Sequence, residues 1–517
     1  MQNLVELLKE SCLKYPRRRA IIYKNKSISY RSLVERIVHL SQRLSRLGIK
    51  RGDLVGILMA NSADFVISYF AILNLEAVVI PLNNFLKPEE LQIILEDSAL
   101  RFIFTDSTFA KTIEYLKKAT NALVDCLFID RDLGREFKFF RKPLKNFGLD
   151  ELKSNTTEKD LAVILYTSGT TGQPKGAMLS HGNLLFDVLT CVKAIEVAKN
   201  DNFICMLPLF HSFPSTVCVL LPFAVGATTT IVEGVRPFSK VLKAILRHRV
   251  TVFVSIPAIY NVLVNVHFPR FIFFPLMRKI FIPLRLAISG AAALPPETLK
   301  RFEEKFDVPL LEGYGLTETS PVVSLNPLKG ARIAGSVGRP LEGIEVRVVD
   351  ENDKDVAQGV VGELLVKGEN VTRGYFNKPN ETKEALKEGW LYTGDLAKID
   401  KDGFIYIIDR KKDMINVRGL KVYPREVEEV FFKHPAIKEV AVVGIKDEHH
   451  GEVPKAFVVL KEGTIASEHE LLHFLRTHIA GYKVPRCIDF RDSLPKTASG
   501  KISKRSLDVR NCPLPTN

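Results

Sequence analysis

A loop rich in glycine and hydroxyl residues, YTSGTTGQPKG at residues 166–176, constrains the fold and chemistry of this 517-residue chain more than any other segment. It directly follows the apolar segment LAVIL, which is typical of a buried strand. Glycines let the backbone turn sharply and bring its N–H groups close to an anion, while hydroxyl groups add donors and a lysine adds positive charge. We therefore predict a phosphate-binding loop formed by Thr167, Ser168, Gly169, Thr170, Thr171, Gly172 and Lys175.

Two other interpretations of this loop are weaker. It is not a Walker loop, because no G-x-x-x-x-G-K-[ST] pattern can be drawn through it. It could be a surface turn that binds nothing, since clusters of glycine, serine, threonine and proline usually have that role. We give the surface turn little weight, because the loop lies between a strand of buried type and a helical stretch for which Asn183 is a suitable N-cap.

The order of strand-like and helix-like segments predicts an α/β fold. From residue 53 to residue 306, apolar strand segments alternate with amphipathic helices, which indicates parallel sheets covered by helices. From about residue 335, short β-type segments separated by glycine and aspartate predict a small antiparallel sheet or barrel. After DRKKD at residues 409–413, the pattern is typical of a compact α+β domain. We predict a large N-terminal domain at residues 1–411 with a β-rich subdomain at about 335–411, and a small mobile C-terminal domain at residues 412–517.

Composition restricts the classes of function. A hydrophobic content of 46% and a charged content of 26% are typical of a globular protein. The net charge of +14 would attract polyanionic substrates such as nucleotides, or an anionic membrane surface. Nucleic acid is not favoured, because the chain has no recognition-helix signature, zinc-finger spacing or long basic run. The seven cysteines never occur in C-x-x-C spacing and the N-terminus resembles no signal peptide, so we expect reduced thiols in a cytoplasmic protein.

Two apolar segments raise the question of a membrane. Residues 202–232 contain no Asp, Glu, Lys or Arg, but Pro208, Pro214 and Pro222 divide them into short pieces, so we expect the interior of an α/β sheet. Residues 268–289 carry four basic residues among their aromatic residues. This second segment cannot span a bilayer, but it could lie on a membrane surface or form a core helix, and both interpretations stay open.

Four further motifs occur downstream of the loop: SGAAALP at residues 289–295, GYGLTE at 313–318, YTGD at 392–395 and PKTASGK at 495–501. Together with the loop and the stretch DRKKDMINVRG, they resemble the adenylate-forming superfamily of acyl-CoA synthetases, peptide-synthetase adenylation domains and beetle luciferases. The resemblance spans essentially the whole chain, and the motifs stand in the order found in that family. One such motif alone would be a weak signal.

The resemblance implies a reaction in two steps. A carboxylate attacks the α-phosphorus of ATP and releases pyrophosphate, and a thiol such as that of CoA then displaces AMP from the acyl-AMP. ATP and CoA would be co-substrates, with Mg²⁺ as cofactor. In-line attack at phosphorus needs charge neutralisation and alignment more than covalent help from the protein.

The resemblance also assigns residue roles. The loop from Thr167 to Lys175 would hold the β- and γ-phosphates, Thr317 would bond a phosphate oxygen, and Glu318 would bind Mg²⁺, which prefers oxygen ligands. Tyr314 would stack on adenine. Taken singly, Tyr314 could belong to a core and Glu318 to a helix N-terminus, and only their joint occurrence favours the nucleotide roles. The other residues that would contact the nucleotide, its ribose or the acyl group are Gly290, Ala291, Ala292, Gly313, Gly315, Asp395 and Arg410.

Three implied roles concern catalysis and domain movement. Lys501 would bridge the attacking carboxylate and the α-phosphate, stabilising charge in the transition state. Lys412 would be the hinge about which the C-terminal domain rotates, so that the loop around Gly419 then lines a channel for the pantetheine arm of CoA. His211 would position the acyl carboxylate or shape its pocket, although a structural interior histidine is a serious alternative.

The substrate class follows from smaller features. Phe210 is followed by His211, where amino-acid adenylation domains usually place an aspartate, so amino acids are disfavoured. The charge-free residues 202–232 would suit an acyl tunnel or simply a core. The chain looks most similar to bacterial long-chain fatty acyl-CoA ligases, which implies free fatty acid, ATP and CoA as substrates. The only tryptophan, Trp390, lies in GWLYTGD, so no indole is left to gate an acyl tunnel and the chain length stays open.

Several alternatives stay open at this point. The acceptor could be an acyl carrier protein rather than CoA, and the acid could be of medium chain length or aromatic. A nucleotide-binding protein without turnover is disfavoured, because Glu318, Asp395, Arg410 and Lys501 are all present. The sequence decides neither a homodimer nor peripheral contact with a membrane.

Overall fold

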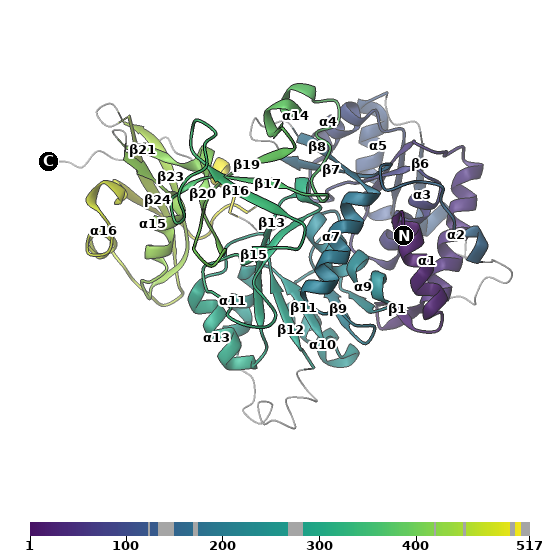
Figure 1. Ribbon diagram of the computed structural model, residues 1–517, viewed down its shortest axis with the longest axis horizontal. Helices are drawn as coiled ribbons and strands as arrows, with labels where there is room; N and C mark the ends of the chain where they lie inside the picture. The colour runs from purple at the N-terminus through teal and green to yellow at the C-terminus, as the bar shows by residue number, and fades with distance from the viewer. Residues whose placement is uncertain are drawn as a thin grey trace. The chain divides into compact units, whose positions relative to one another are not determined.

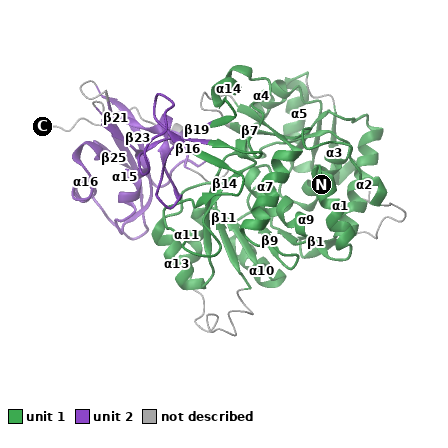
Figure 2. Cartoon of the chain, in the orientation of Figure 1, with its two compact units in different colours: residues 1–346, 366–391 green, residues 347–365, 392–517 purple. Residues whose placement is uncertain are grey.

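The computed structural model describes residues 1–121, 125–132, 149–168, 174–266, 283–417, 420–447, 451–496 and 502–507. The chain forms two compact units, one comprising residues 1–346 and 366–391, the other residues 347–365 and 392–517 (Figure 2). Helices and strands occur in both units, which confirms the predicted α/β class. The hinge expected at Lys412 stays a prediction.

The largest sheet of the first unit has nine strands in the order β15-β14-β13-β12-β11-β9-β10-β1-β2 (Figure 1). The strands from β13 to β1 run parallel, and the outer strands pair antiparallel. Every residue of β9 to β12 is buried, as expected of parallel strands covered on both faces. The strands are β1 Arg19–Tyr23, β2 Lys26–Ser29, β9 Asn202–Cys205, β10 Thr228–Ile231, β11 Val252–Ser255, β12 Leu286–Ser289, β13 Leu310–Gly315, β14 Val322–Leu325 and β15 Arg339–Pro340.

A second sheet of the first unit has six strands in the order β6-β5-β3-β4-β7-β8. The strands from β6 to β7 are parallel, while β7 and β8 form an antiparallel hairpin. The hairpin is the element that carries the predicted phosphate-binding loop. The strands are β3 Leu54–Leu58, β4 Val78–Pro81, β5 Phe102–Thr105, β6 Asp125–Phe128, β7 Leu161–Ser168 and β8 Pro174–Ser180.

Helices pack on both sheets of the first unit through apolar faces. Val241, Tyr260 and Phe302, from three helices, form one core cluster with Phe253 and Ala287 of the nine-stranded sheet. Fully burying such an aliphatic or aromatic side chain contributes about 1.5–3 kcal/mol. The helices of this unit are α1 Leu4–Lys14, α2 Tyr30–Arg46, α3 Ala63–Asn74, α4 Pro88–Ser98, α5 Ala110–Ala119, α6 Ile129–Asp132, α7 His181–Ala194, α8 Ser212–Ser215, α9 Leu221–Val225, α10 Phe238–His248, α11 Pro257–Asn265, α13 Pro296–Phe306 and α14 Pro379–Ala385.

Helix α7 begins earlier than the sequence predicted. Its N-cap is Ser180, whose hydroxyl oxygen accepts a hydrogen bond from the backbone N–H of Asn183 at 3.1 Å. The side chain of Asn183 accepts in return from the N–H of Ser180 at 2.8 Å. Asn183 is therefore the third helical residue of a capping box rather than the N-cap itself.

The charge-free residues 202–232 form short elements, as the prolines predicted. Strand β9 is followed by α8, a π-helical turn at Thr216–Leu220, α9 and strand β10. Phe203, Val217 and Phe223 are buried. Among the described residues, none of the helices has the length and apolar character required to cross a bilayer.

The segment at residues 268–289, expected to lie on a membrane or to form a core helix, is partly described. Residues 267–282 lie outside the described residues. Residues 286–289 form the buried strand β12, and the guanidinium of Arg285 pairs with the carboxylate of Asp201 at 2.6 Å. This strand agrees with the alternation of strands and helices predicted for residues 53–306. The two interpretations of the preceding residues, as a membrane-surface segment or a core helix, stay open.

A five-stranded sheet follows in the region predicted to be β-rich, in the order β16-β17-β19-β18 with β20 beside β19. Its strands are β16 Glu345–Val349, β17 Gly362–Lys367, β18 Leu386–Lys387, β19 Trp390–Ile399 and β20 Ile405–Arg410.

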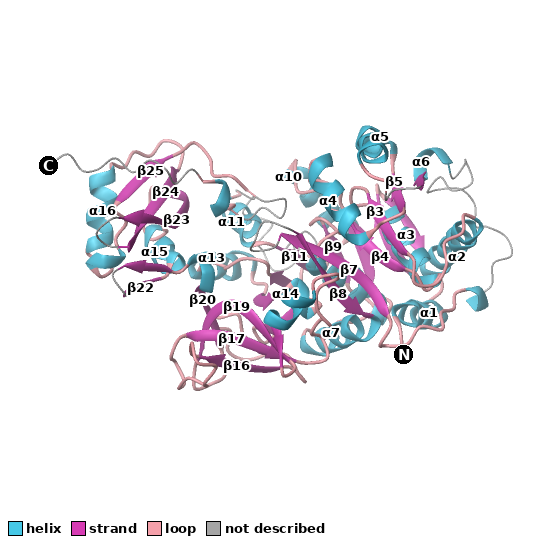
Figure 3. Cartoon of the chain, turned by 90° about the horizontal axis from the view of Figure 1, so that it is seen from above, coloured by secondary structure: helices cyan, strands magenta, loops and turns pink. Residues whose placement is uncertain are grey.

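The second unit contains another five-stranded sheet, in the order β22-β21-β24-β23 with β25 beside β24. Helices α15 Pro424–Phe431 and α16 Glu468–Arg476 pack on this sheet (Figure 3). Phe431 and Leu471 from the helices share a core with Val442 and Val458 from the strands. The strands are β21 Ile415–Val417, β22 Leu420–Val422, β23 Ile437–Asp447, β24 Gly451–Leu460 and β25 Cys487–Phe490.

The cysteines agree only in part with the expectation of reduced thiols. Of the six cysteines in the described ranges, five are free, and all of these except Cys126 are buried. Cys487 is disulfide-bonded, contrary to the prediction. The spacing of cysteines along a sequence does not reveal which of them meet in the fold.

Candidate active site

Strands β7 and β8 bring the two ends of the predicted phosphate-binding loop together. Thr167 lies opposite Lys175 in the antiparallel ladder, and its hydroxyl donates to the carbonyl oxygen of Lys175 at 3.4 Å. A Cβ on Gly176 would lie 2.7 Å from the side chain of Ile164, so this position has no room for a larger residue. The predicted loop residues Gly169, Thr170, Thr171 and Gly172 lie outside the described residues, as does the side chain of Ser168.

The base of this hairpin is tied to two helices. The hydroxyl of Tyr166, on β7, donates to Asp97 of α4 at 2.7 Å. The ammonium of Lys378, at the start of α14, lies 3.3 Å from the same carboxylate. Burial and then the hydrogen bond to Asp97 raise the pKa of Tyr166, so it stays a neutral donor. Lys175 therefore projects from a hairpin that partly buried polar contacts fix to two helices.

The motif GYGLTE forms a tight turn at the end of β13. A Cβ on Gly315 would lie 1.8 Å from the carbonyl oxygen of Pro321, so only glycine fits there. The hydroxyl of Thr319 accepts from the N–H of Leu316 at 3.0 Å and donates to Pro321 at 2.7 Å. These bonds fix the turn that carries Thr317 and Glu318, both of which are half-buried. Gly313 and Tyr314 pair with β14 in the same region.

Tyr375 connects the two predicted nucleotide-binding motifs of the first unit. Its hydroxyl donates to Oε1 of Glu318 at 2.9 Å, and the ammonium of Lys175 lies 5.2 Å from the centroid of its ring. The backbone of Tyr375 is held beside β8 by a bridge to Ala177. The structure thus brings Lys175 and Glu318 to the same aromatic side chain.

Sequence reasoning missed Tyr375. It lies in the stretch GYFNKP, which contains no pattern of catalytic or ligand residues. Its role becomes visible only from the pairing of this stretch with β8, including the hydrogen bond from Phe376 N–H to the Gly176 carbonyl at 2.8 Å. A second such bond joins the N–H of Thr372 to the carbonyl of Glu318 at 2.8 Å.

The donor set around Glu318 fits a magnesium ion held largely by a substrate. The hydrogen bond from Tyr375 engages one carboxylate oxygen, whereas a carboxylate offers about four lone-pair sites. Within the described ranges, no group of three or more His, Cys, Asp or Glu residues gathers as a metal cage. Magnesium is commonly bound through one or two carboxylates together with substrate phosphates. The single carboxylate of Glu318 fits this arrangement.

The segment after β12 presents its backbone at the carboxyl end of the sheet. A Cβ on Gly290 would lie 3.0 Å from the ring of Phe213, and the N–H of Gly290 donates to the carbonyl of Ser255 at 3.2 Å. Ala291 has the left-handed backbone angle φ of +68°, which L-residues rarely adopt. Ala291 and Ala292 are exposed, so a ligand could approach their backbone closely.

In the second unit, Asp395 and Arg410 form a cross-strand pair between β19 and β20. The guanidinium Nε of Arg410 lies 2.7 Å from Oδ1 of Asp395, which is only 3% exposed. The hydroxyl of Thr393 accepts from the N–H of Asp395 at 3.1 Å. The two residues that the resemblance assigned to ribose are therefore in direct contact. Gly419 and Lys501 lie outside the described residues, and Lys412 is exposed in the short helical turn after β20.

His211 lies after strand β9 and starts the short helix α8. Its carbonyl accepts the hydroxyl of Ser215 at 2.9 Å, and its ring centroid lies 4.4 Å from that of Phe210. These contacts are compatible both with shaping an acyl pocket and with a structural role. The two interpretations of His211 therefore stay open.

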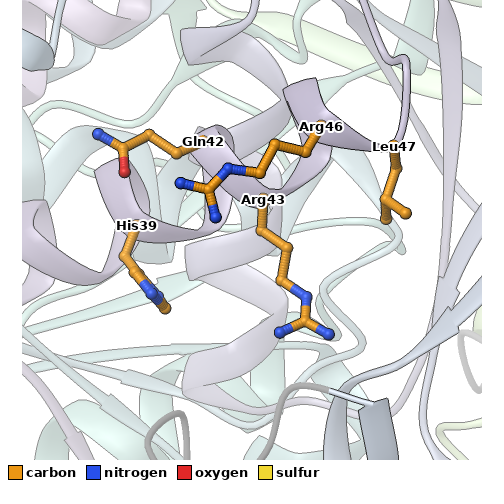
Figure 4. Close-up of a pocket in the computed structure, with 5 residues that line it drawn as sticks. All are labelled: His39, Gln42, Arg43, Arg46 and Leu47. Atoms are coloured by element: carbon orange, nitrogen blue, oxygen red, sulfur yellow. The ribbon is translucent and has the colours of Figure 1, made fainter.

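A cavity of about 350 Å³ lies elsewhere in the first unit, on helix α2. His39, Gln42, Arg43, Arg46 and Leu47 line it, and all come from this helix and the residue after it (Figure 4). None of them belongs to the motifs, and Arg43 already donates to the carbonyl of Asp132. We therefore assign the candidate active site from the motif residues and not from this cavity.

Comparison with known proteins identifies two matching family models. The model described as AMP-binding enzyme matches residues 8–376, and that described as AMP-binding enzyme C-terminal domain matches residues 426–501. A long-chain-fatty-acid–CoA ligase of Bacillus subtilis is 35% identical over 534 residues, covering 98% of this chain and 94% of that protein.

Two solved structures are similar over nearly the whole chain. ATP-bound MatB from Rhodopseudomonas palustris superposes with a TM-score of 0.87 at 32% identity, covering 98% of both chains. The o-succinylbenzoate coenzyme A synthetase MenE of Bacillus subtilis, in complex with ATP and a magnesium ion, gives a TM-score of 0.84 at 28% identity, covering 98% of this chain and 99% of that one.

Proposed function

Because this chain belongs to the AMP-binding enzyme family, we propose that it activates a fatty acid with ATP and transfers the acyl group to CoA. Acid–CoA ligation through an acyl-AMP is the general chemistry, and a long-chain fatty acid is the substrate proposed here. Support for that substrate comes from the Bacillus subtilis ligase, which is 35% identical. The fold alone does not select the acid, since a similar structure is an o-succinylbenzoate CoA synthetase.

The observation that carries the proposal is the contact of Tyr375 with both Glu318 and Lys175. A cation and a hard oxygen ligand thus both contact one aromatic side chain beside the β7–β8 hairpin. ATP needs both, because its phosphates carry concentrated negative charge. Magnesium held by Glu318 and the phosphates would neutralise that charge.

The chain's own residues have the following proposed roles in the first step. Lys175 and Thr167 hold the terminal phosphates, while Tyr375 keeps Glu318 in one orientation. Asp395, buried and paired with Arg410, accepts hydrogen bonds from the ribose hydroxyls. Lys501 neutralises charge on the carboxylate and the α-phosphate as the new bond forms. The roles of Lys501 and of Lys412 as a hinge are proposed from the sequence alone.

The acyl group is proposed to lie among the apolar residues after β9. The described part of residues 202–232 contains no Asp, Glu, Lys or Arg and is largely buried. The ring of Phe213 lies beside Gly290, where a Cβ would lie 3.0 Å from it, and Gly290 directly precedes the exposed Ala291. Such a surface offers no partner for a charged substrate tail, which favours a hydrocarbon chain.

The test is pyrophosphate release from ATP and Mg²⁺ with a series of acids from acetate to long-chain fatty acids, including o-succinylbenzoate. We expect the highest kcat/KM with a long-chain fatty acid, followed by acyl-CoA formation when CoA is added. Acyl carrier protein serves as the alternative acceptor in a parallel reaction. Preference for a short or aromatic acid, or for the carrier protein, would contradict the proposal.

A further inference from the structure

A second cavity, of about 670 Å³, lies in the first unit among residues that the proposed function does not use. Arg19, Asn202 and Thr228, which line it, are the first residues of strands β1, β9 and β10. Because these strands run parallel, their first residues lie at the same edge of the nine-stranded sheet. The motif residues Gly290 and Tyr314 instead stand at the carboxyl ends of β12 and β13. The cavity is therefore at the edge opposite to the candidate active site.

The lining of this cavity is strongly basic. Arg17, Arg18 and Arg19 are consecutive in the chain, and Arg249 joins them from the end of helix α10. Asp201 is the single acidic residue among the lining residues. A cavity with four guanidinium groups and one carboxylate attracts anions.

The single carboxylate does not neutralise these arginines. Both oxygens of Asp201 accept hydrogen bonds from Arg285, from Nε and from Nη2, each at 2.6 Å. The hydroxyl of Thr251 and the N–H of Ala198 also donate to Asp201, at 2.9 Å and 2.8 Å. The charge of Asp201 is therefore matched by Arg285, which leaves the four lining arginines in excess.

Three of the four guanidinium groups are available to a ligand. In the part of the chain that the structure describes, Arg17, Arg19 and Arg249 form no ion pair or side-chain hydrogen bond, and all three are exposed. Arg18 differs, because it donates to the carbonyls of Gly226 and Lys199. Guanidinium groups match phosphate oxygens in a two-pronged geometry, so free ones in a concave site favour phosphate.

The backbones that carry these side chains are fixed. Arg19 begins β1, and its carbonyl accepts the hydroxyl of Thr228 at 2.8 Å. Arg249 ends helix α10 with φ of +54°, and its N–H donates to Ile245. The floor of the cavity is held by the side chain of Asn202, which donates to the carbonyl of His248 at 2.8 Å. Only the side chains need to adjust when an anion binds.

His248, which also lines the cavity, reports on its electrostatics. Burial lowers the pKa of His248, and the positive charges of Arg247 and Arg19 lower it further. Its ring nitrogen Nε2 shares a hydrogen bond with Asn25 at 3.1 Å. A bound dianion would offset the positive field and raise the pKa of this histidine.

We propose that this basic cavity is a second anion site, which binds a phosphate group at the amino-terminal edge of the nine-stranded sheet. The phosphate belongs either to a soluble phosphoester or to the headgroup of an anionic phospholipid. The volume of the cavity, about 670 Å³, is larger than that of a phosphate group alone. This favours a ligand that carries further atoms attached to its phosphate. This site does not depend on the identity of the acid that the enzyme activates.

The test compares the full-length protein with the variant Arg19→Gln/Arg249→Gln. A control variant, Lys111→Gln/Lys401→Gln, removes the same charge from exposed positions elsewhere. Inorganic phosphate is titrated while the ring resonances of His248, assigned by their loss in His248→Gln, are followed by NMR. We expect phosphate to raise the pKa of His248 in the wild type and the control, and to bind about tenfold more weakly or worse to the arginine variant.

A second arm separates the two sources of phosphate. Sedimentation is measured with vesicles of phosphatidylcholine alone and with vesicles that also contain phosphatidylglycerol. Binding to the anionic vesicles that is lost in the arginine variant but kept in the control identifies a lipid headgroup. Phosphate binding without vesicle binding identifies a soluble phosphoester. If neither phosphate nor anionic vesicles distinguish the arginine variant from the control, the second site does not exist.

Discussion

At the scale of single residues, the most informative contact is the hydrogen bond from Tyr375 to Glu318. The glycines and hydroxyl groups of the loop allowed a phosphate site to be predicted from the sequence, because that chemistry is local. The partner of Glu318 could not be predicted in this way. Tyr375 lies far from both Glu318 and Lys175 in the chain, and only the pairing of its stretch with β8 brings the three together.

Tyr375→Phe removes this hydrogen bond and keeps the ring beside Lys175. A hydrogen bond to a charged group is worth about 1.5–3 kcal/mol, so we expect kcat/KM for ATP to fall about tenfold to a hundredfold. We also expect a higher Mg²⁺ concentration for half-maximal pyrophosphate release, because Glu318 loses its fixed orientation. Tyr406→Phe is the matched control, since its hydroxyl bonds Asp400 at 3.0 Å in the second unit. An unchanged Mg²⁺ requirement would contradict the positioning role.

Lys501→Ala tests the residue to which we assign the first step. We expect loss of acyl-AMP formation, while thiolysis of supplied acyl-AMP is largely kept, because only the first step builds charge at the α-phosphorus. Lys496→Ala is the control within the same motif, since the ammonium of Lys496 pairs with Glu439 at 2.6 Å. The two half-reactions are measured separately, and equal losses in both would speak against this role.

At the scale of elements, the hydrophobic pattern predicted the alternation of strands and helices, because the period of each is visible among neighbouring residues. Helix α4, Pro88–Ser98, coincides with the segment PEELQIILEDS. The start of α7 was missed, since the sequence contains both Ser180 and Asn183 as suitable caps and only the backbone decides between them. Strand β12, at the end of the basic aromatic segment, agrees with the predicted alternation of strands and helices, and it pairs with β11.

His181, at the start of α7, predicts how stability depends on pH. Its Nδ1 accepts the N–H of Leu4 at 3.3 Å, which only the neutral ring can do. Burial lowers its pKa from 6.5 to about 4, although Asp160 acts weakly in the opposite direction. The unfolded chain therefore binds a proton between these values and the folded chain does not. The stabilisation, about 3 kcal/mol at most, is complete above pH ~6.5 and is lost as the pH falls towards ~4.

The variant His181→Gln isolates this effect, because glutamine can accept the same N–H but does not titrate. Thermal unfolding is measured at about pH 7 and about pH 5, inside the window set by the two pKa values. We expect the midpoint of the wild type to fall more between the two conditions than that of the variant. If the midpoints of the wild type and the variant fall equally, protonation of His181 does not cause the loss of stability at low pH.

At the scale of the whole molecule, the sequence motifs and the family models both indicate an enzyme that catalyses two half-reactions. The resemblance places a hinge at Lys412, which is exposed in the turn Lys411–Asp413. The movement itself could not be derived from the sequence, because periodicity and composition describe elements and not their relative positions. The basic cavity was not predicted for a similar reason, since its residues come from segments that are far apart in the chain.

Lys412→Pro restricts the backbone at the proposed hinge. We expect acyl transfer to CoA to slow more than acyl-AMP formation, because only the second step requires the rotated arrangement. Lys412→Ala removes the same ammonium but leaves the backbone free, and it should keep the ratio of the two rates. The two steps are followed by pyrophosphate release and by acyl-CoA formation. If the ratio of the two rates is unchanged in the proline variant, the hinge is not at Lys412.

The left-handed backbone of Ala291 has a consequence for engineering this protein. A residue with a side chain pays about 1–2 kcal/mol in such a conformation, so the surrounding packing, and not local preference, maintains the shape of the segment after β12. Thermostabilising campaigns that relieve unfavourable torsions would single out this position early. A substitution there would raise the melting temperature, but it would change the backbone of the segment after β12, which we expect to contact the ligand.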